Sequence, residues 1–255
     1  MDATGAKKPD PEWLKNAESM SAFVFYAKNG YPDAMDGYDG HQPFDRRYMG
    51  RHGDSKLYPV HCCAYANDTD GLAAALGAMS SSSEGGDSTT TVRAAINSKD
   101  QTLRTPLMHA VTDANAYSRL NRKLQGNEGR AQAIVRCTEM LLAAGANPAG
   151  QDTFGFSAAH LAAWASHKCP EPLLLLAAGA TGPDGTDLGA ARALLTQPNI
   201  DGDTPLDSAR RCNCYKMVAA LEKVEDQQKL TELLAPHIQR LKQLREERES
   251  SISCG

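Results

Sequence analysis

Cysteine and histidine are the side chains in this sequence that could do chemistry, and there are seven of each. Cys169 follows His167 and Lys168, a basic neighbourhood of the kind that can lower a thiol pKa and create a nucleophile. The sequence names no third group that would orient such a pair. Cys62–Cys63 and Cys212–Cys214 lack a second ligand pair at zinc spacing. We therefore expect no catalytic residue and no metal ligand.

The motifs of nucleotide and hydrolase sites are also missing. The chain contains no GxGxxG, GxxxxGK[ST], GxSxG or HExxH pattern. The glycine-containing run from Ser83 to Asp87 is acidic, which makes it a poor cradle for phosphate. We expect neither an enzyme nor a cofactor, and no small-molecule substrate.

Composition narrows the class of protein further. The 255 residues include 27 Lys and Arg and 31 Asp and Glu, and the resulting net charge of −4 argues against a nucleic-acid binder. The longest apolar run, Leu173–Ala178, is far shorter than the roughly 18 residues of a membrane span. The first residues are rich in acids and prolines, unlike a signal peptide, and an odd number of cysteines is typical of reduced thiols. We expect a protein that is not secreted and does not insert into a membrane, placed in the cytoplasm, with the cytoskeleton and the nucleus as alternatives.

One short pattern recurs through the middle of the chain. Thr or Ser suits the N-cap of a helix, proline suits its first residue, and a small sixth residue lets a neighbouring helix approach. The pattern predicts four helix starts, at Tyr58–Cys63, Thr105–Ala110, Ser157–Ala162 and Thr204–Ala209.

A second signal marks two helix ends. Met140–Ala146 and Leu174–Ala180 are apolar runs that close on Gly-Ala. Glycine adopts the left-handed conformation cheaply, so Gly145 and Gly179 are predicted to stop their helices.

Together these signals resemble the ankyrin repeat, most closely over Ile96–Leu107 and Asn199–Leu206. The resemblance covers residues 53–222 and implies an all-α solenoid of helix-turn-helix units, with repeats starting near 53, 100, 152 and 199. Leu103 stands where the family has a turn glycine, and Ala158 where it has proline. The helix starts at 58, 105, 157 and 204 are 47, 52 and 47 residues apart, against about 33 in the family.

The surplus residues predict three enlarged connections. Ser80–Thr91 is rich in Ser, Thr and Gly and predicts a loop, and Asn115–Arg130 predicts a basic loop between two helices. Thr181–Pro198 is the third, with a short extra helix expected over Asp187–Thr196.

The two ends differ from the middle. Residues 1–52 hold eight of the fifteen aromatics, and Trp13–Ala27 is a candidate helix. This extension either caps the first repeat or docks a partner. Residues 223–255 form the C-terminal segment, in which 223–249 predicts a long helix that Pro236 would kink or split. Its apolar stripe, which caps the fourth repeat or pairs with another protein, comprises Leu230, Leu233, Leu234, Ile238, Leu241 and Leu244.

The resemblance also implies where the protein would act. Ankyrin proteins bind other proteins through the turn tips and the exposed side of the first helices. His61 and His160 stand where the family has a histidine with a structural hydrogen bond to the turn backbone. By position, the expected partner-binding residues are Leu57, Tyr65, Arg104, Thr112, Phe154, Phe156, Trp164, Ile200, Asp203 and Arg211. The aromatics of repeat three stand out, because clustered exposed rings mark interaction sites. The alternative is that the N-terminal extension or an inserted loop covers them.

Two functions fit these features. The first is an adaptor or structural subunit that holds one or more proteins within an assembly. The second is a regulatory subunit or inhibitor of an enzyme, switched by phosphorylation of the Ser80–Thr91 loop.

Overall fold

The computed structural model describes most of the chain from Tyr58 onward. The described residues are 58–81, 93–94, 96–99, 103–112, 119–164 and 169–253. Within these ranges the chain is helical and forms no strand, apart from one isolated bridge between Gln151 and Ser157, so the all-α prediction is confirmed. The extension 1–52, its candidate helix and nearly all of the Ser80–Thr91 loop lie outside the described residues.

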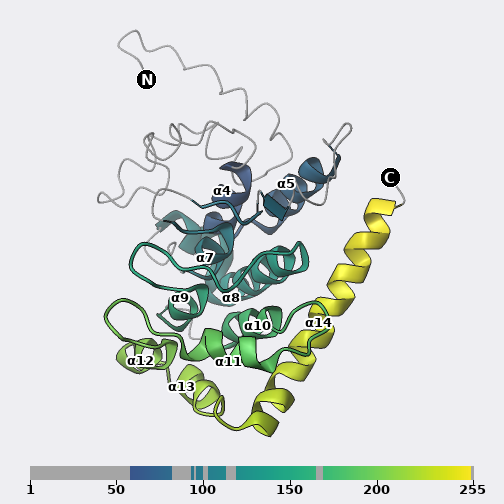
Figure 1. The fold of residues 1–255 in the computed structure, drawn as a ribbon. Helices are drawn as coiled ribbons and strands as arrows, with labels where there is room; N and C mark the ends of the chain where they lie inside the picture. Colours follow the sequence, from purple (N-terminus) through teal and green to yellow (C-terminus); the bar gives the residue numbers. More distant parts are fainter. Residues whose placement is uncertain are drawn as a thin grey trace.

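Helices follow one another in pairs along the described chain. The pairs are α4 (Tyr58–Ala66) with α5 (Thr69–Ser81), α7 (Pro106–Val111) with α8 (Arg119–Ala143), α9 (Ala158–Trp164) with α10 (Glu171–Ala180), and α12 (Pro205–Arg211) with α13 (Tyr215–Leu221). The first helices pack in chain order, α4 on α7, α7 on α9 and α9 on α12, and the second helices pack α5 on α8 and α8 on α10 (Figure 1).

Two of the predicted helix starts, at Thr105 and Thr204, are confirmed by their caps. The Thr105 hydroxyl accepts a hydrogen bond from the Met108 amide at 3.4 Å. Thr204 and Asp207 form a capping box, in which the Asp207 carboxylate accepts from the Thr204 amide at 3.0 Å and from its hydroxyl at 2.6 Å. These bonds favour the ionised acid and hold the pKa of Asp207 below its usual value.

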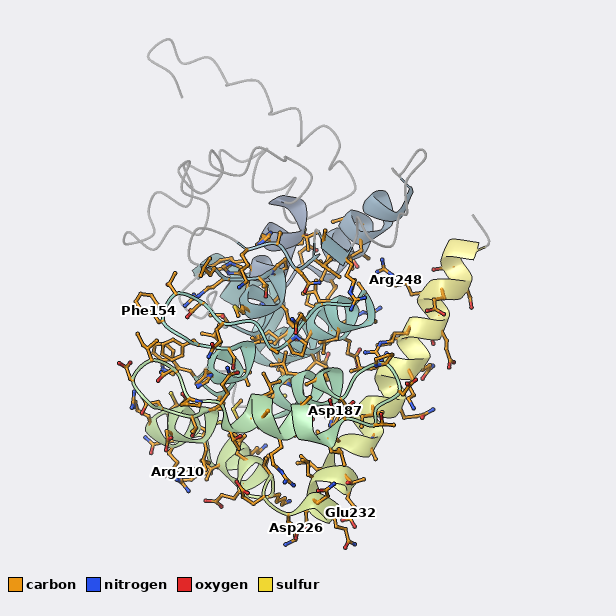
Figure 2. The ribbon with its side chains drawn as sticks, viewed as in Figure 1. Phe154, Asp187, Arg210, Asp226, Glu232 and Arg248 are labelled. Carbon is orange, nitrogen blue, oxygen red and sulfur yellow. The ribbon has the colours of Figure 1, made fainter. Side chains whose placement is uncertain are left out.

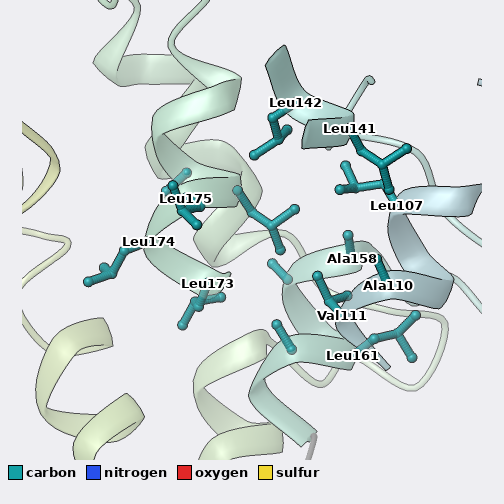
Figure 3. Packing of buried hydrophobic residues seen from close by; sticks show 14 of the residues in the cluster. Leu107, Ala110, Val111, Leu141, Leu142, Ala158, Leu161, Leu173, Leu174 and Leu175 are labelled. Atoms are coloured by element: carbon teal, nitrogen blue, oxygen red, sulfur yellow. The ribbon is translucent and has the colours of Figure 1, made fainter. Parts of the chain in front are cut away.

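Small residues bring the first helices together. Ala110, Ala162 and Ala209, the sixth residues of their motifs, are fully buried. Figure 3 shows Leu107, Ala110 and Val111 of α7 facing Ala158 and Leu161 of α9, with leucines of α8 and α10 closing the same core.

Helix α10 is buried on every side. All seven residues from Pro172 to Ala178 are buried, and the helix packs against α8, α9 and two further helices. A helix that is apolar all round must be enclosed. It therefore needs more neighbours than its own pair supplies.

The first of those neighbours is the predicted extra helix, which is confirmed as α11 (Leu188–Thr196). The Asp187 carboxylate caps it by accepting from the Ala190 amide at 2.8 Å. Ala191, Leu194 and Leu195 are buried, on the helix that packs against α10.

The second neighbour is the C-terminal helix α14 (Gln227–Ser253), whose predicted stripe is confirmed: Leu230, Leu234 and Leu241 are buried. Pro236 does not split the helix, which continues through this exposed position to Ser253.

The expectation that α14 caps the fourth repeat is wrong. The helix packs chiefly against α10 and α8, running back along them (Figure 1). The physical reason is that α10 has an apolar side to cover, whereas the exposed positions of α13 include the charged Lys216. An Arg240–Glu139 ion pair at 3.2 Å and a bond from Arg245 to the Pro183 carbonyl at 3.2 Å border the contact.

Two further expectations are corrected. The predicted loop Asn115–Arg130 is helical from Arg119, because these residues extend α8 at its N-terminal end and are mostly good helix formers. Gly145 does end α8, with φ +95°, but Gly179 lies inside α10. A Cβ on Gly179 would lie 2.7 Å from Leu142 Cδ2, so this glycine serves close packing of α10 on α8.

This difference predicts opposite effects for two glycine substitutions. We expect Gly179→Ala to destabilise the fold by about 1–2 kcal/mol, because the added methyl meets Leu142 in a packed core. Gly129→Ala in α8, where a Cβ meets nothing within 4 Å, should stabilise the fold by roughly 0.5–1 kcal/mol. Urea unfolding of both variants tests this, and equal effects would contradict the packing role.

Candidate functional site

Two turns of the same construction precede α9 and α12. The Asp152 carboxylate accepts hydrogen bonds from the amides of Phe154 and Phe156 at 2.9 and 3.0 Å. Asn199 does the same for Asp201 and Asp203, at 2.9 Å each. A side chain that bonds its own backbone two and four residues onward fixes the loop. Thr153–Phe154 and Ile200–Asp201 are thereby held at the tips.

Left-handed residues complete the turns. Gly155 and Gly202 have φ of +74° and +83°, and Leu103, at the matching position two residues before its N-cap, has φ +60°. The turn before α7 thus keeps this backbone conformation without glycine, at a cost of about 1–2 kcal/mol.

The two turns are joined to each other. The Ile200 amide donates to the Phe154 carbonyl at 3.3 Å, and a Cβ on Gly155 would lie 2.9 Å from the Ile200 amide nitrogen. Both loops project from the same side of the molecule, opposite α14 (Figure 1). The tips therefore form one continuous surface.

His160 connects α9 to the following turn. Its Nδ1 lies 3.2 Å from the Ser157 amide and 2.9 Å from the Ser157 hydroxyl, and its Nε2 lies 3.0 Å from the Asp203 carbonyl. The neutral ring with its proton on Nε2 satisfies all three, so the expected structural hydrogen bond to the turn backbone is confirmed for His160. Burial lowers the pKa of His160 below its usual value of 6.5.

The three charged residues among the expected partner-binding residues form ion pairs inside the chain. Arg104 Nε lies 3.1 Å from the buried Asp152 carboxylate and so ties the α7 start to the next turn. Arg211 pairs with Asp203 at 2.6 Å. These charges stabilise the turns as well as bordering the surface.

Apolar side chains are exposed on this surface. Phe154, Trp164 and Ile200 are 56%, 59% and 69% exposed, and Figure 2 shows Phe154 at the outer edge of its loop. Phe156 stacks on Trp164 with ring centroids 6.1 Å apart and meets His160 edge-on at 5.7 Å. We call Phe154, Phe156, Trp164 and Ile200 the turn-face patch.

The remaining expected residues lie elsewhere. Tyr65 is partly buried, and its ring packs edge-on against His109 at 5.9 Å. The Thr112 hydroxyl donates to the Met108 carbonyl at 2.6 Å at the end of α7. Leu57 lies outside the described residues. No sequence pattern singled out Tyr215, which is 78% exposed at the start of α13.

The candidate nucleophile has no thiolate character. The Cys169 thiol donates to the Glu171 carboxylate at 2.7 Å, and burial with this bond raises the thiol pKa to about 11. His167 and Lys168 lie outside the described residues. In the part of the chain with assigned positions, no three His, Cys, Asp or Glu side chains gather as metal ligands, and no helix there is long and apolar enough to cross a membrane.

A scan against protein-family models finds no match for this chain, and a search of the curated proteins finds no significant match.

The lowered pKa of His160 predicts a loss of stability in acid. Below pH 6.5 the unfolded chain binds a proton that the folded ring resists, so the free energy of unfolding falls by at most about 1.4 kcal/mol per pH unit for this group. Thermal unfolding between pH 7.5 and 5.5 should show the fall. His160→Asn should show a shallower pH dependence, with His237, whose pKa burial also lowers, as the remaining contributor. An unchanged slope in His160→Asn would contradict this assignment.

The contact between the tips predicts unequal effects for two turn glycines. Alanine at either site adopts a left-handed backbone at a cost of about 1–2 kcal/mol. Gly202→Ala should cost only this, since its Cβ meets nothing within 4 Å. Gly155→Ala should cost at least about 1 kcal/mol more, because its Cβ meets Ile200 backbone. Equal losses in urea unfolding would show that the tips do not touch.

Proposed function

We propose that this chain is an ankyrin-type repeat protein that binds another protein through the turn-face patch, as an adaptor or structural subunit without catalytic activity. The placement of its helices supports this, because four helix pairs follow one another and the first helices pack in chain order. The lengthened α8, the inserted α11 and the returning α14 are departures from a plain array of such repeats.

The observation that carries the proposal is the turn-face patch itself. Phe154, Trp164 and Ile200 are more than half exposed on loops held by side-chain hydrogen bonds and by a bond between the tips. Aromatic side chains dominate the energetics of protein interfaces, and a preformed surface loses little conformational entropy on binding.

The rest of the chain fits a protein partner better than other ligands. The net charge of −4 disfavours nucleic acid. The described cysteines, Cys63, Cys137, Cys169, Cys212 and Cys214, are free thiols, in keeping with the cytoplasmic placement we propose. The raised pKa of the Cys169 thiol disfavours this residue as a catalytic nucleophile, which supports a binding function.

The proposal is tested by comparing an exposed aromatic of the turn-face patch with one that is not part of it. Trp164→Ala should lower capture of the partner by at least about tenfold, because a central interface aromatic is worth roughly 2 kcal/mol or more. Tyr215→Ser is the control, a still more exposed ring at the start of α13, and should retain capture. The measurement is quantitative mass spectrometry of proteins captured from native extract by each full-length variant.

Thermal unfolding of both variants excludes trivial loss of fold, and Trp164 rather than Phe156 is chosen because Phe156 also packs on the core. Partners captured equally by wild type and Trp164→Ala would overturn the assignment of the turn-face patch.

A further inference from the structure

We propose that the turn-face patch is covered within the same chain by residues 44–51, the sequence Phe-Asp-Arg-Arg-Tyr-Met-Gly-Arg that ends seven residues before α4. This inference concerns what occupies the patch in the free protein. It stands independently of whether an external partner binds there.

The patch has the features of a surface that needs a cover. Its apolar members come from two adjacent turns and one helix end, and the carbonyl of one tip is already bonded to the amide of the other. Clustered exposed rings are unfavourable in water and mark contact sites. A cover for it needs apolar side chains of its own, and residues 44–51 supply Phe44, Tyr48 and Met49.

Charge points to the same segment. Asp201 is exposed beside Ile200, and among the described residues no cation pairs with it, whereas Asp203 is paired with Arg211. Residues 44–51 carry Arg46, Arg47 and Arg51 against Asp45, a net charge of +2. Arginine also stacks on aromatic faces, and the exposed Trp164 ring offers one.

The chain is long enough to reach. Helix α4 contacts α7, and α7 contacts α9, so the α4 and α9 axes lie about 16–20 Å apart at usual helix spacings. The eleven residues from Arg47 to Tyr58 span up to roughly 36 Å when extended. The connecting chain is therefore long enough for Arg47 and Tyr48 to meet Trp164 while α4 stays in place.

Covalent linkage makes even a weak contact effective. A segment on a short tether has an effective concentration near 1 mM. A contact with a dissociation constant of about 0.1 mM would then cover the patch in roughly nine molecules of ten. Any external partner that uses the patch has to displace this segment, which lowers its apparent affinity about tenfold.

The test uses Trp164 as its own reporter. The chain has two tryptophans, so Trp13→Phe leaves Trp164 alone in the full-length protein. Acrylamide quenching, with a neutral quencher, measures the fraction of Trp164 open to solvent. We expect a blue-shifted emission and an open fraction of about a tenth. A fully open, water-like Trp164 in this chain would overturn the proposal. The same result is expected if the N-terminal extension caps the first repeat instead.

Removing the cover should open the ring. In the Trp13→Phe background, Phe44→Ser, Arg46→Glu, Arg47→Glu and Tyr48→Ser together should raise the open fraction about tenfold. The matched control makes the same types of change elsewhere in the extension: Lys15→Glu, Tyr26→Ser, Lys28→Glu and Tyr31→Ser, and it should leave quenching unchanged. Circular dichroism checks that both variants keep their helices.

Two other outcomes identify other occupants and so contradict the proposal. Quenching that depends on protein concentration would indicate a second copy of the chain on the patch. A protected Trp164 in the quadruple variant would indicate a different covering segment. If the quadruple variant loses its helices, the acrylamide quenching of Trp164 in the Trp13→Phe protein still tests the proposal, because residues 44–51 are unaltered there. Loss of partner capture in Trp164→Ala is a separate measurement, so either idea can fail without the other.

Discussion

The burial of α10 is the constraint on which the rest of the structure depends. Its leucines, Leu173 to Leu176, each contribute about 2 kcal/mol only if water is excluded from them. The paired helix α9 and the preceding α8 cover part of this surface, and α11 and α14 cover more. The inserted residues and the C-terminal segment are therefore parts of one core, and removing either would expose an apolar side of α10.

This constraint also separates the two faces of the molecule. Helix α14 covers the side formed by α8 and α10, and it turns polar residues such as Glu232 and Gln239 toward solvent. On the opposite side, where the turns project, none of the helices in the described ranges plays this covering role (Figure 2). Exposed apolar side chains are thus concentrated on the one side whose backbone is fixed by Asp152 and Asn199.

Stability and recognition share residues on that side. Arg104, Asp203 and Arg211 were expected to meet a partner, yet each holds a turn within the chain. Phe156 stacks on Trp164, meets His160 edge-on and packs on the core as well. The turns can be rigid because these interactions are internal, and the rigidity is what places Phe154 and Ile200 side by side.

The sequence by itself determined the local elements. Helix starts at Thr105 and Thr204, the end at Gly145, the extra helix after Asp187 and the α14 stripe were all predictable, because capping, left-handed glycine and apolar periodicity act over a few residues. Tertiary structure alone decided that α14 returns along α10, that Gly179 serves packing against Leu142, and that Arg104 pairs with Asp152. These depend on residues far apart in the chain, as in the Arg104–Asp152 bond with its separation of 48. No local pattern records which of several compatible surfaces an apolar stripe or a charge will meet, since that choice is made by the packing of the whole core.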